Sequence, residues 1–233
     1  MMHYIRYIVS TVLLLVVLGA NAQDSVKVVT AKDTTQVQPK KKYFSVMLGT
    51  DYGKLISTAF KLETKYEVNV GLLLFSKIRI TGDYGHGELE PKNAIENGSY
   101  TSTGDYYRAG IDYVFEIAPK TYLGLGAMYA SSDFSDKGNV QIQSDIWPSL
   151  NEEFTRENFS AKWVEWVLTS EKTVANKEKG FLSNLYVGMK FRLRFMIEKP
   201  EPEAFDVYAI PGYGRTFNDI VPAANLFIAY RIN

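Results

Sequence analysis

The stretch ANLFIAYRIN, residues 224–233, alternates bulky apolar residues with other residues along its whole length. Positions of one parity, from Leu226 to Ile232, are apolar, and the positions between them include Asn225 and Arg231. Successive side chains of a β-strand point to opposite faces, so this alternation predicts a strand with one apolar face.

Seven earlier stretches show the same alternation, and no Lys, Arg, Asp or Glu falls on their apolar side within their cores. The predicted strands are 43–52, 65–73, 78–86, 106–117, 122–131, 161–170, 184–197 and 224–233. Connections after the second and fourth strands are tight, whereas those after the third, fifth and seventh are long and polar. This asymmetry is typical of membrane barrels. It predicts an all-β fold, an eight-stranded antiparallel up-and-down transmembrane β-barrel.

A soluble lipocalin-like barrel would show the same alternation turned inside out, so the chemistry of each face must decide. The apolar side carries Leu125, Trp166, Phe191 and more bulk than a small cavity would hold. The predicted lumen charge network is Glu67, Arg79, Asp83, Arg108, Asp112, Glu116, Glu165, Lys190, Arg192, Arg194 and Arg231. Acids and bases nearly cancel, as a narrow lumen requires. We expect these side chains to fill the interior, with a charged ion pathway as the alternative.

The N-terminus predicts export. Arg6 precedes an apolar run over 8–18 and the small residues Ala20-Asn21-Ala22, so residues 1–22 are interpreted as a signal peptide cleaved before Gln23. The run is shorter than the ~20 residues that a spanning helix needs. Residues 23–42 are predicted to form a flexible periplasmic tail, and 43–233 the outer-membrane barrel, in contact with outer-membrane lipid.

Composition excludes several other functions. The formal net charge is +0, which argues against a nucleic-acid partner, and the chain has no cysteine. There is no phosphate-binding glycine loop and no HExxH, so we expect no cofactor, no metal and no catalytic residue. A Ser/His/Asp arrangement of His86, Asp83 and Ser131 or Ser132 rests on residue types alone, and His86 is interpreted as a polar strand-end residue.

Two long connections carry aromatic residues suited to specific contacts. The partner-facing loop candidates are Trp147, Tyr208, Ile210, Pro211, Gly212 and Tyr213. Proline and glycine predict that the second of these connections is ordered. Two interpretations stay open for it: a partner surface, or a cap over the barrel mouth.

Several short motifs together resemble a family of small outer-membrane proteins of Bacteroidota. They are Gly82-Asp83-Tyr84-Gly85, Tyr106-Tyr107-Arg108-Ala109-Gly110, Trp163-Val164-Glu165-Trp166, Asn184-Leu185-Tyr186-Val187-Gly188, Ile210-Pro211-Gly212-Tyr213-Gly214 and Ala229-Tyr230-Arg231. The resemblance implies a single barrel of the OmpA/OmpX-like eight-stranded superfamily. It also implies that the protein is one of the accessory subunits around the barrel-assembly machine. Asn233 departs from the aromatic residue that ends many outer-membrane proteins.

These observations favour a non-enzymatic structural or accessory subunit of an envelope machine, such as the barrel-assembly or secretion apparatus, with a protein partner in an envelope complex. The main alternative is a narrow porin-like channel or small-ligand transporter. A third is an enzyme at the barrel rim that acts on lipid.

Overall fold

The computed structural model describes residues 44–59, 64–91, 94–95, 97–142, 150–175, 181–202 and 206–232. The signal peptide and tail predicted at 1–22 and 23–42 lie outside these residues and stay predictions. The longer strands are β1 (Phe44–Asp51), β2 (Thr64–Leu74), β3 (Ile78–Leu89), β4 (Gly98–Ala118), β5 (Thr121–Ile142), β6 (Leu150–Thr173), β7 (Leu185–Glu198) and β10 (Ile220–Ile232). The shorter elements are the helix α2 (Tyr52–Ala59), the 3-10 helix η2 (Phe181–Asn184), β8 (Ala209–Ile210) and β9 (Gly214–Arg215).

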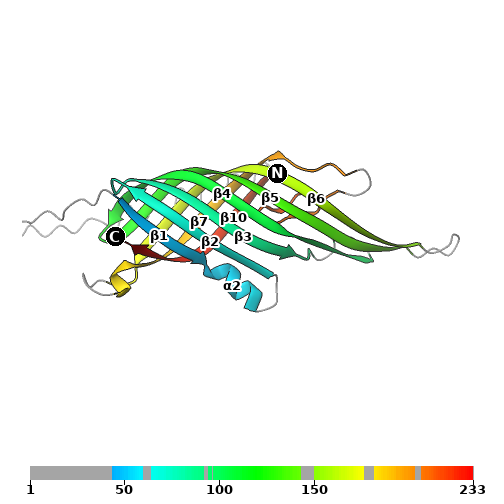
Figure 1. Cartoon of the computed structure of the whole chain (residues 1–233), viewed down its shortest axis with the longest axis horizontal. Helices are drawn as coiled ribbons and strands as arrows, with labels where there is room; N and C mark the ends of the chain where they lie inside the picture. The colour runs from blue at the N-terminus through cyan, green and yellow to red at the C-terminus, as the bar shows by residue number, and fades with distance from the viewer. Residues whose placement is uncertain are drawn as a thin grey trace, which may run out of the picture. The chain divides into compact units, whose positions relative to one another are not determined.

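The longer strands form one closed antiparallel barrel in the order β1-β10-β7-β6-β5-β4-β3-β2 (Figure 1). Closure comes from β1, in which Gly49 lies opposite Asn69 of β2 on one side and Ala229 of β10 on the other. Each of the eight longer strands overlaps one of the predicted segments, so the eight-stranded up-and-down fold is confirmed.

The barrel wall is apolar outside and charged inside. Leu125 and Trp166 point outward and are 53% and 68% exposed, whereas Glu165, the neighbour of Trp166, is 0% exposed. A ligand-binding soluble barrel has the reverse arrangement, so the inside-out alternative is wrong. A basic residue in the middle of such an outer face would cost about 2–4 kcal/mol in a bilayer. The absence of charge from the outer face of the strand cores follows from this cost.

Three neighbouring strands are much longer than the sequence predicts. β4, β5 and β6 have 21, 22 and 24 residues, and their long ends form an extension that Figure 1 shows projecting from one side of the barrel. β3 pairs with β4 only as far as Ser102, so residues 98–101 of β4 have no partner in β3. β7 pairs with β6 only as far as Lys162, so residues 150–161 of β6 have no partner in β7. Backbone ladders continue outside the bilayer, but no face there has to be apolar. The alternation therefore fades before the strands end.

The first connection holds the helix α2, which the sequence analysis did not predict. β1 stops at Asp51, whose carboxylate accepts a hydrogen bond from the Lys54 amide (3.1 Å) and caps the helix. α2 packs against β2 and β10, the two neighbours that continue beyond the end of β1. Lys54 reaches the barrel interior, while Leu55 and Ile56 are exposed. Within the described residues, no helix is long and apolar enough to cross a membrane.

At the opposite end of the barrel, the connections after β2 and β4 are short turns, as predicted. In the β2–β3 connection Phe75 and Ser76 both have positive φ, 52° and 58°, and the Lys77 amide donates to the Leu74 carbonyl. This is the geometry of a type I′ turn, whose twist matches that of a hairpin. We call this end of the barrel the turn side and the other end the loop side.

Candidate functional site: a filled interior and its plug

The interior holds two groups of ion pairs. The loop-side cluster consists of Lys54, Glu67, Asp83, Arg108, Glu165, Lys190, Arg192 and Arg194. The turn-side cluster consists of Arg79, Asp112, Glu171 and Arg231. Their side chains occupy the alternate strand positions that face the lumen, except Lys54, which reaches inward from α2. Side chains of opposite charge therefore meet across the lumen.

In the loop-side cluster each carboxylate is shared by several cations. Arg108 donates to Glu67 (Nη1–Oε2, 2.8 Å) and to Glu165 (Nε–Oε1, 2.9 Å). Arg192 donates to Glu165 (Nη1–Oε2, 2.7 Å) and to Asp83 (Nη2–Oδ2, 2.7 Å). These five side chains are at most 4% exposed, so few of their charges reach water. Removal of one partner from such a network leaves a buried charge without compensation.

The turn-side cluster is smaller and neutral. Arg79 donates to Asp112 (Nη2–Oδ2, 2.7 Å) and to Glu171 (Nη1–Oε2, 2.7 Å), and Arg231 lies 3.3 Å from Glu171 Oε1. Arg231 also rests over the ring of Tyr186, 4.2 Å from its centroid. Glycines at 124 and 126 leave the space that Asp112 and Arg79 occupy, as a β-carbon at either position would meet Asp112.

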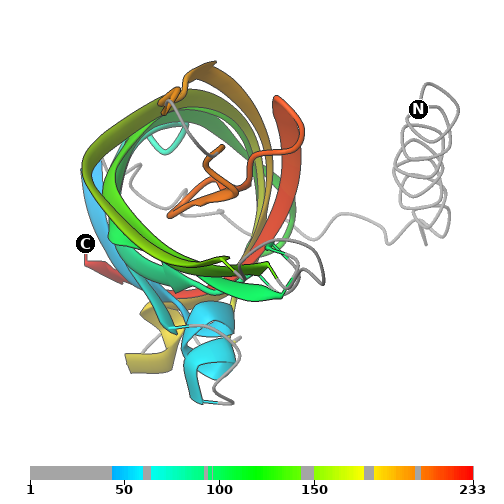
Figure 2. The same ribbon diagram turned by 90° about the vertical axis from the view of Figure 1, so that its right-hand side faces the viewer.

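The seventh connection folds back into the barrel as a plug. The plug comprises residues 207–216, with the hairpin of β8 and β9 at its centre, and Figure 2 shows this hairpin within the ring of strands. Ile210 and Tyr213 are 0% exposed. They pack with Tyr106, Phe134 and Trp163 of the barrel wall.

Two arginines of the loop-side cluster hold the plug by its backbone. Arg108 Nη2 donates to the Gly212 carbonyl (2.8 Å), and Arg194 Nη1 donates to the Tyr213 carbonyl (2.5 Å). Gly212 has φ +80° and lies against the ring of Tyr106, where a β-carbon would clash. The hairpin therefore depends on glycine for both its turn and its close approach to the wall.

The plug corrects the prediction of a partner-facing loop. Ile210, Pro211 and Tyr213 are buried inside the barrel, and Gly212 is tied to Arg108, so none of them presents a side chain to a partner. The alternative of a cap over the barrel mouth describes this segment correctly. Burial raises the pKa of Tyr213 to about 12. Trp147, the remaining candidate besides Tyr208, lies outside the described residues.

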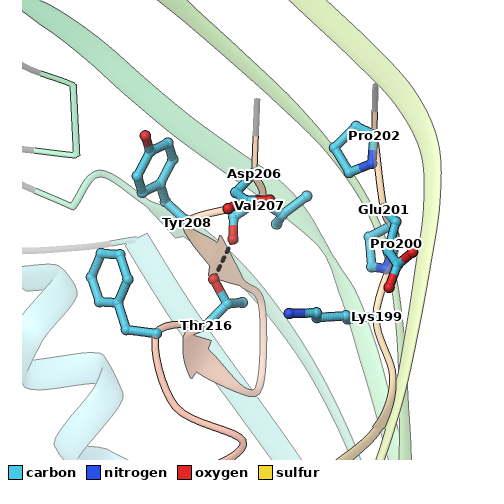
Figure 3. Close-up of a pocket in the computed structure, with 9 residues that line it drawn as sticks. Lys199, Pro200, Glu201, Pro202, Asp206, Val207, Tyr208 and Thr216 are labelled. Carbon is cyan, nitrogen blue, oxygen red and sulfur yellow. Dashed lines mark hydrogen bonds between the residues drawn. The ribbon is translucent and has the colours of Figure 1, made fainter. Parts of the chain in front are cut away.

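Tyr208 lines a separate pocket of about 510 Å³ between the chain that leaves β7 and the plug (Figure 3). Its ring makes edge contacts with Phe217 and Tyr100, with centroids 6.1 and 5.3 Å apart. The pocket also contains Lys199, Glu201 and Asp206, and the hydroxyl of Thr216 donates to the Val207 carbonyl at its floor. Because the charges are mixed, the lining favours no one class of ligand.

Sequence reasoning placed one interior residue wrongly and missed three. Glu116 is exposed and accepts a hydrogen bond from the Lys120 amide at the β4–β5 turn, so it is not part of the lumen network. The missed residues are Asp51, Lys54 and Glu171. Glu171 shares the parity of Glu165, but the sixth strand was predicted to end at residue 170. The alternation of a strand could not predict that Lys54 faces the interior, because this residue lies on the helix α2.

The structure does not assemble the Ser/His/Asp arrangement. His86 points to the outer wall, where its ring stacks on Tyr66 and its Nδ1 lies 2.7 Å from Asp105, whereas Asp83 points into the lumen. Among the described residues there is also no group of three or more His, Asp or Glu side chains that could hold a metal ion. The charged groups of this interior are engaged with one another.

The extension has an ion pair of its own. Arg156 donates to Asp136 through Nε (2.8 Å) and Nη2 (2.5 Å), and the hydroxyl of Tyr100 donates to the same carboxylate (2.8 Å). Burial, followed by this hydrogen bond, raises the pKa of Tyr100 above its ordinary value. The contact joins all three long strands outside the barrel.

Fold and site together define a small transmembrane β-barrel with a filled lumen and an ordered extension. The chain belongs to the family described as a domain of unknown function, DUF6048, whose model matches residues 4–233. A comparison with curated proteins finds no match.

Two solved structures share the barrel architecture at low similarity. Neisserial surface protein A has 10% identity and a TM-score of 0.40, covering 82% of this chain and 97% of its own. Ail, the attachment invasion locus protein of Yersinia pestis, has 9% identity and a TM-score of 0.39, covering 81% and 97%. Likeness at this distance carries no argument about what the chain binds.

Proposed function

We propose that the protein is a non-enzymatic outer-membrane barrel that serves as a structural or accessory subunit of an envelope complex. Its barrel anchors the chain in lipid, and its extension contacts a protein partner. The apolar outer wall supports the membrane location, and the predicted signal peptide supports the outer membrane as the compartment.

The filled interior is the observation that carries this proposal. An eight-stranded barrel is only just wide enough for its own side chains, and here the two charged clusters and the plug occupy that space. A channel would need a continuous water path past Arg108 and Arg194, both of which are tied to the plug. The narrow channel is therefore the second candidate, and it requires the plug to leave.

The extension supports the proposed contact with a partner. The β6 edge from residue 150 to 161 has no paired strand on its outer side among the described residues. Glu152, Glu153 and Glu157 lie along it and are exposed. Unpaired backbone groups on an edge strand are a template for another chain, and acidic side chains favour a basic partner segment.

The test is affinity purification of the tagged protein from native outer membranes in mild detergent, followed by mass spectrometry. We expect one stoichiometric envelope protein to remain bound. The double variant Glu153→Lys with Glu157→Lys should lose it, and Lys77→Glu, an exposed charge change at the β2–β3 turn, should keep it. A protein that purifies alone would overturn the accessory role.

Conductance of planar bilayers tests the second candidate. We expect no steady single-channel current from the purified barrel. A current that rises in Gly212→Ala, which strains the plug, would instead favour a gated channel.

A further inference from the structure

The wall of the barrel has a seam where β1 ends early. β1 pairs with β10 as far as Asp51 and with β2 as far as Thr50. Residues 220–226 of β10 and 64–67 of β2 therefore continue past the end of β1 with no partner in that strand. The helix α2 follows β1 directly and packs against both of these strands, and Figure 2 shows it, in cyan, outside the ring of strands. α2 thus covers the seam from the outside.

Hydroxyl groups bind the backbone of β2 along this seam. Thr58 of α2 accepts a hydrogen bond from the Lys65 amide (2.8 Å) and donates one to the Lys65 carbonyl (2.9 Å). Thr50 donates to the Glu67 carbonyl (2.8 Å). Water can solvate the free edge of a strand but lipid cannot, so a wall beside lipid has to satisfy these groups within the protein. The hydrogen bonds between α2 and β2 therefore suit a position at the boundary of the lipid.

A row of tyrosines on the outer wall marks the level of this seam. The ring centroid of Tyr66 lies 6.4 Å from that of Tyr84, which in turn lies 5.3 Å from that of Tyr107. Tyr66 and Tyr107 are 42% and 51% exposed. Aromatic residues are enriched where the wall of a membrane barrel meets the headgroups. Because Lys65 directly precedes Tyr66, its contact with α2 lies at the headgroup level of the loop side.

The outer side of α2 is apolar and joins the lipid-facing wall. Leu55 and Ile56 are 44% and 49% exposed. Lys54, the one charged residue of the helix, reaches inward to the loop-side cluster. At the base of the helix, a β-carbon on Gly53 would lie 3.5 Å from Cβ of Leu226, which is itself exposed on the wall. The apolar surface of the wall therefore continues onto α2 without a break in charge, and lipid is the occupant that such a surface fits.

We propose that α2 is an interfacial helix, with Leu55 and Ile56 inserted among the lipid headgroups and upper acyl chains on the loop side. The helix takes the place of the missing end of β1 and separates Lys54 and the charged lumen from lipid. It also fixes how deeply the barrel sits, so that the extension stands clear of the lipid. The inference rests on the membrane location in the proposed function, and it needs no protein partner.

Fluorescence quenching at known depths tests the position of α2. The chain has no cysteine, so Leu55→Cys and Ile56→Cys each carry a single bimane label on the folded barrel in phosphatidylcholine vesicles. The quenchers are lipids with a nitroxide near the headgroup, lipids with a nitroxide deep in the acyl chain, and iodide on both sides of the vesicle. We expect both labels to be quenched most by the shallow nitroxide. Iodide quenching should be weaker by about threefold or more than at Glu153→Cys on the extension, since an interfacial helix buries its apolar side about 5–10 Å into the headgroup boundary.

Two control positions separate this inference from the proposed function. Ile111→Cys, on the lipid-facing wall of β4, should be quenched most by the deep nitroxide, and Glu153→Cys by iodide. If Ile111→Cys behaves in this way while the label at either 55 or 56 responds to iodide as Glu153→Cys does, the inference is wrong although the barrel is in the membrane. Strong iodide quenching of Ile111→Cys as well would overturn the membrane location itself, and this inference with it.

Discussion

The two charged clusters of the lumen are built from the same residue types but have different tasks. In the turn-side cluster Arg79, Asp112, Glu171 and Arg231 are neutral as a set and join only strands. In the loop-side cluster cations outnumber carboxylates, and two of the arginines also hold the plug. Each guanidinium has five N–H donors, so Arg108 and Arg194 can bind backbone carbonyls of the plug as well as carboxylates. The turn-side cluster fills the barrel, and the loop-side cluster also closes it.

The largest effect is expected from Glu165→Leu. Arg108, Arg192 and Arg194 would lose the carboxylate they share, and breaking a buried network of this kind costs about 3–5 kcal/mol. Urea unfolding in lipid vesicles, followed by tryptophan fluorescence, measures the loss. Glu157→Leu on the exposed extension is the matched control. A loss below about 1 kcal/mol would mean that the network contributes no more than one ordinary hydrogen bond.

Glu171→Leu should cost less, about 2–3 kcal/mol, because Arg79 keeps Asp112 while Arg231 loses its carboxylate partner. The same unfolding experiment applies. Limited proteolysis of the plug should remain as slow as in the parent, since no residue of the turn-side cluster touches it. Faster cleavage would show that the two clusters are coupled.

Gly212→Ala should act on the plug alone. Its φ of +80° is unfavourable for alanine by about 1–2 kcal/mol, and the new methyl group would meet the ring of Tyr106. We expect faster protease cleavage within 207–216 and a nearly unchanged urea midpoint for the barrel. Gly82→Ala is the control, because a β-carbon at this position would make only ordinary contacts with Val70 and the Arg108 carbonyl. Equal protection of both variants would contradict the role of Gly212 in holding the plug.

The smallest effect is expected from Lys162→Met. Its ion pair with Glu198 (Nζ–Oε2, 2.8 Å) is exposed on both sides, so solvent screens it. The urea midpoint should not change measurably, in contrast to both buried clusters. A clear loss of stability would show that the base of the extension, rather than the lumen, limits unfolding.

The sequence predicted the barrel well because the bilayer demands the same thing of every strand. Outward positions such as Val164, Trp166 and Leu168 are apolar wherever lipid surrounds the wall, and inward positions of the same strand, such as Glu165, are not. This period of two needs no knowledge of neighbours. The alternation ends where the strands leave the bilayer, so the sequence analysis did not predict the long extensions of β4, β5 and β6.

Alternation alone determined which face of its strand most interior charges occupy, and it determined the apolar wall, because both depend only on the side of one strand that a residue occupies. Which charges meet, the helical path of Lys54 and the burial of Ile210 and Tyr213 were decided by the tertiary structure. Closing the ring brings distant strands within hydrogen-bond distance, as for Arg192 and Asp83. It also creates a lumen with room for a returning loop. Such contacts arise from three-dimensional closure, so no local pattern records them.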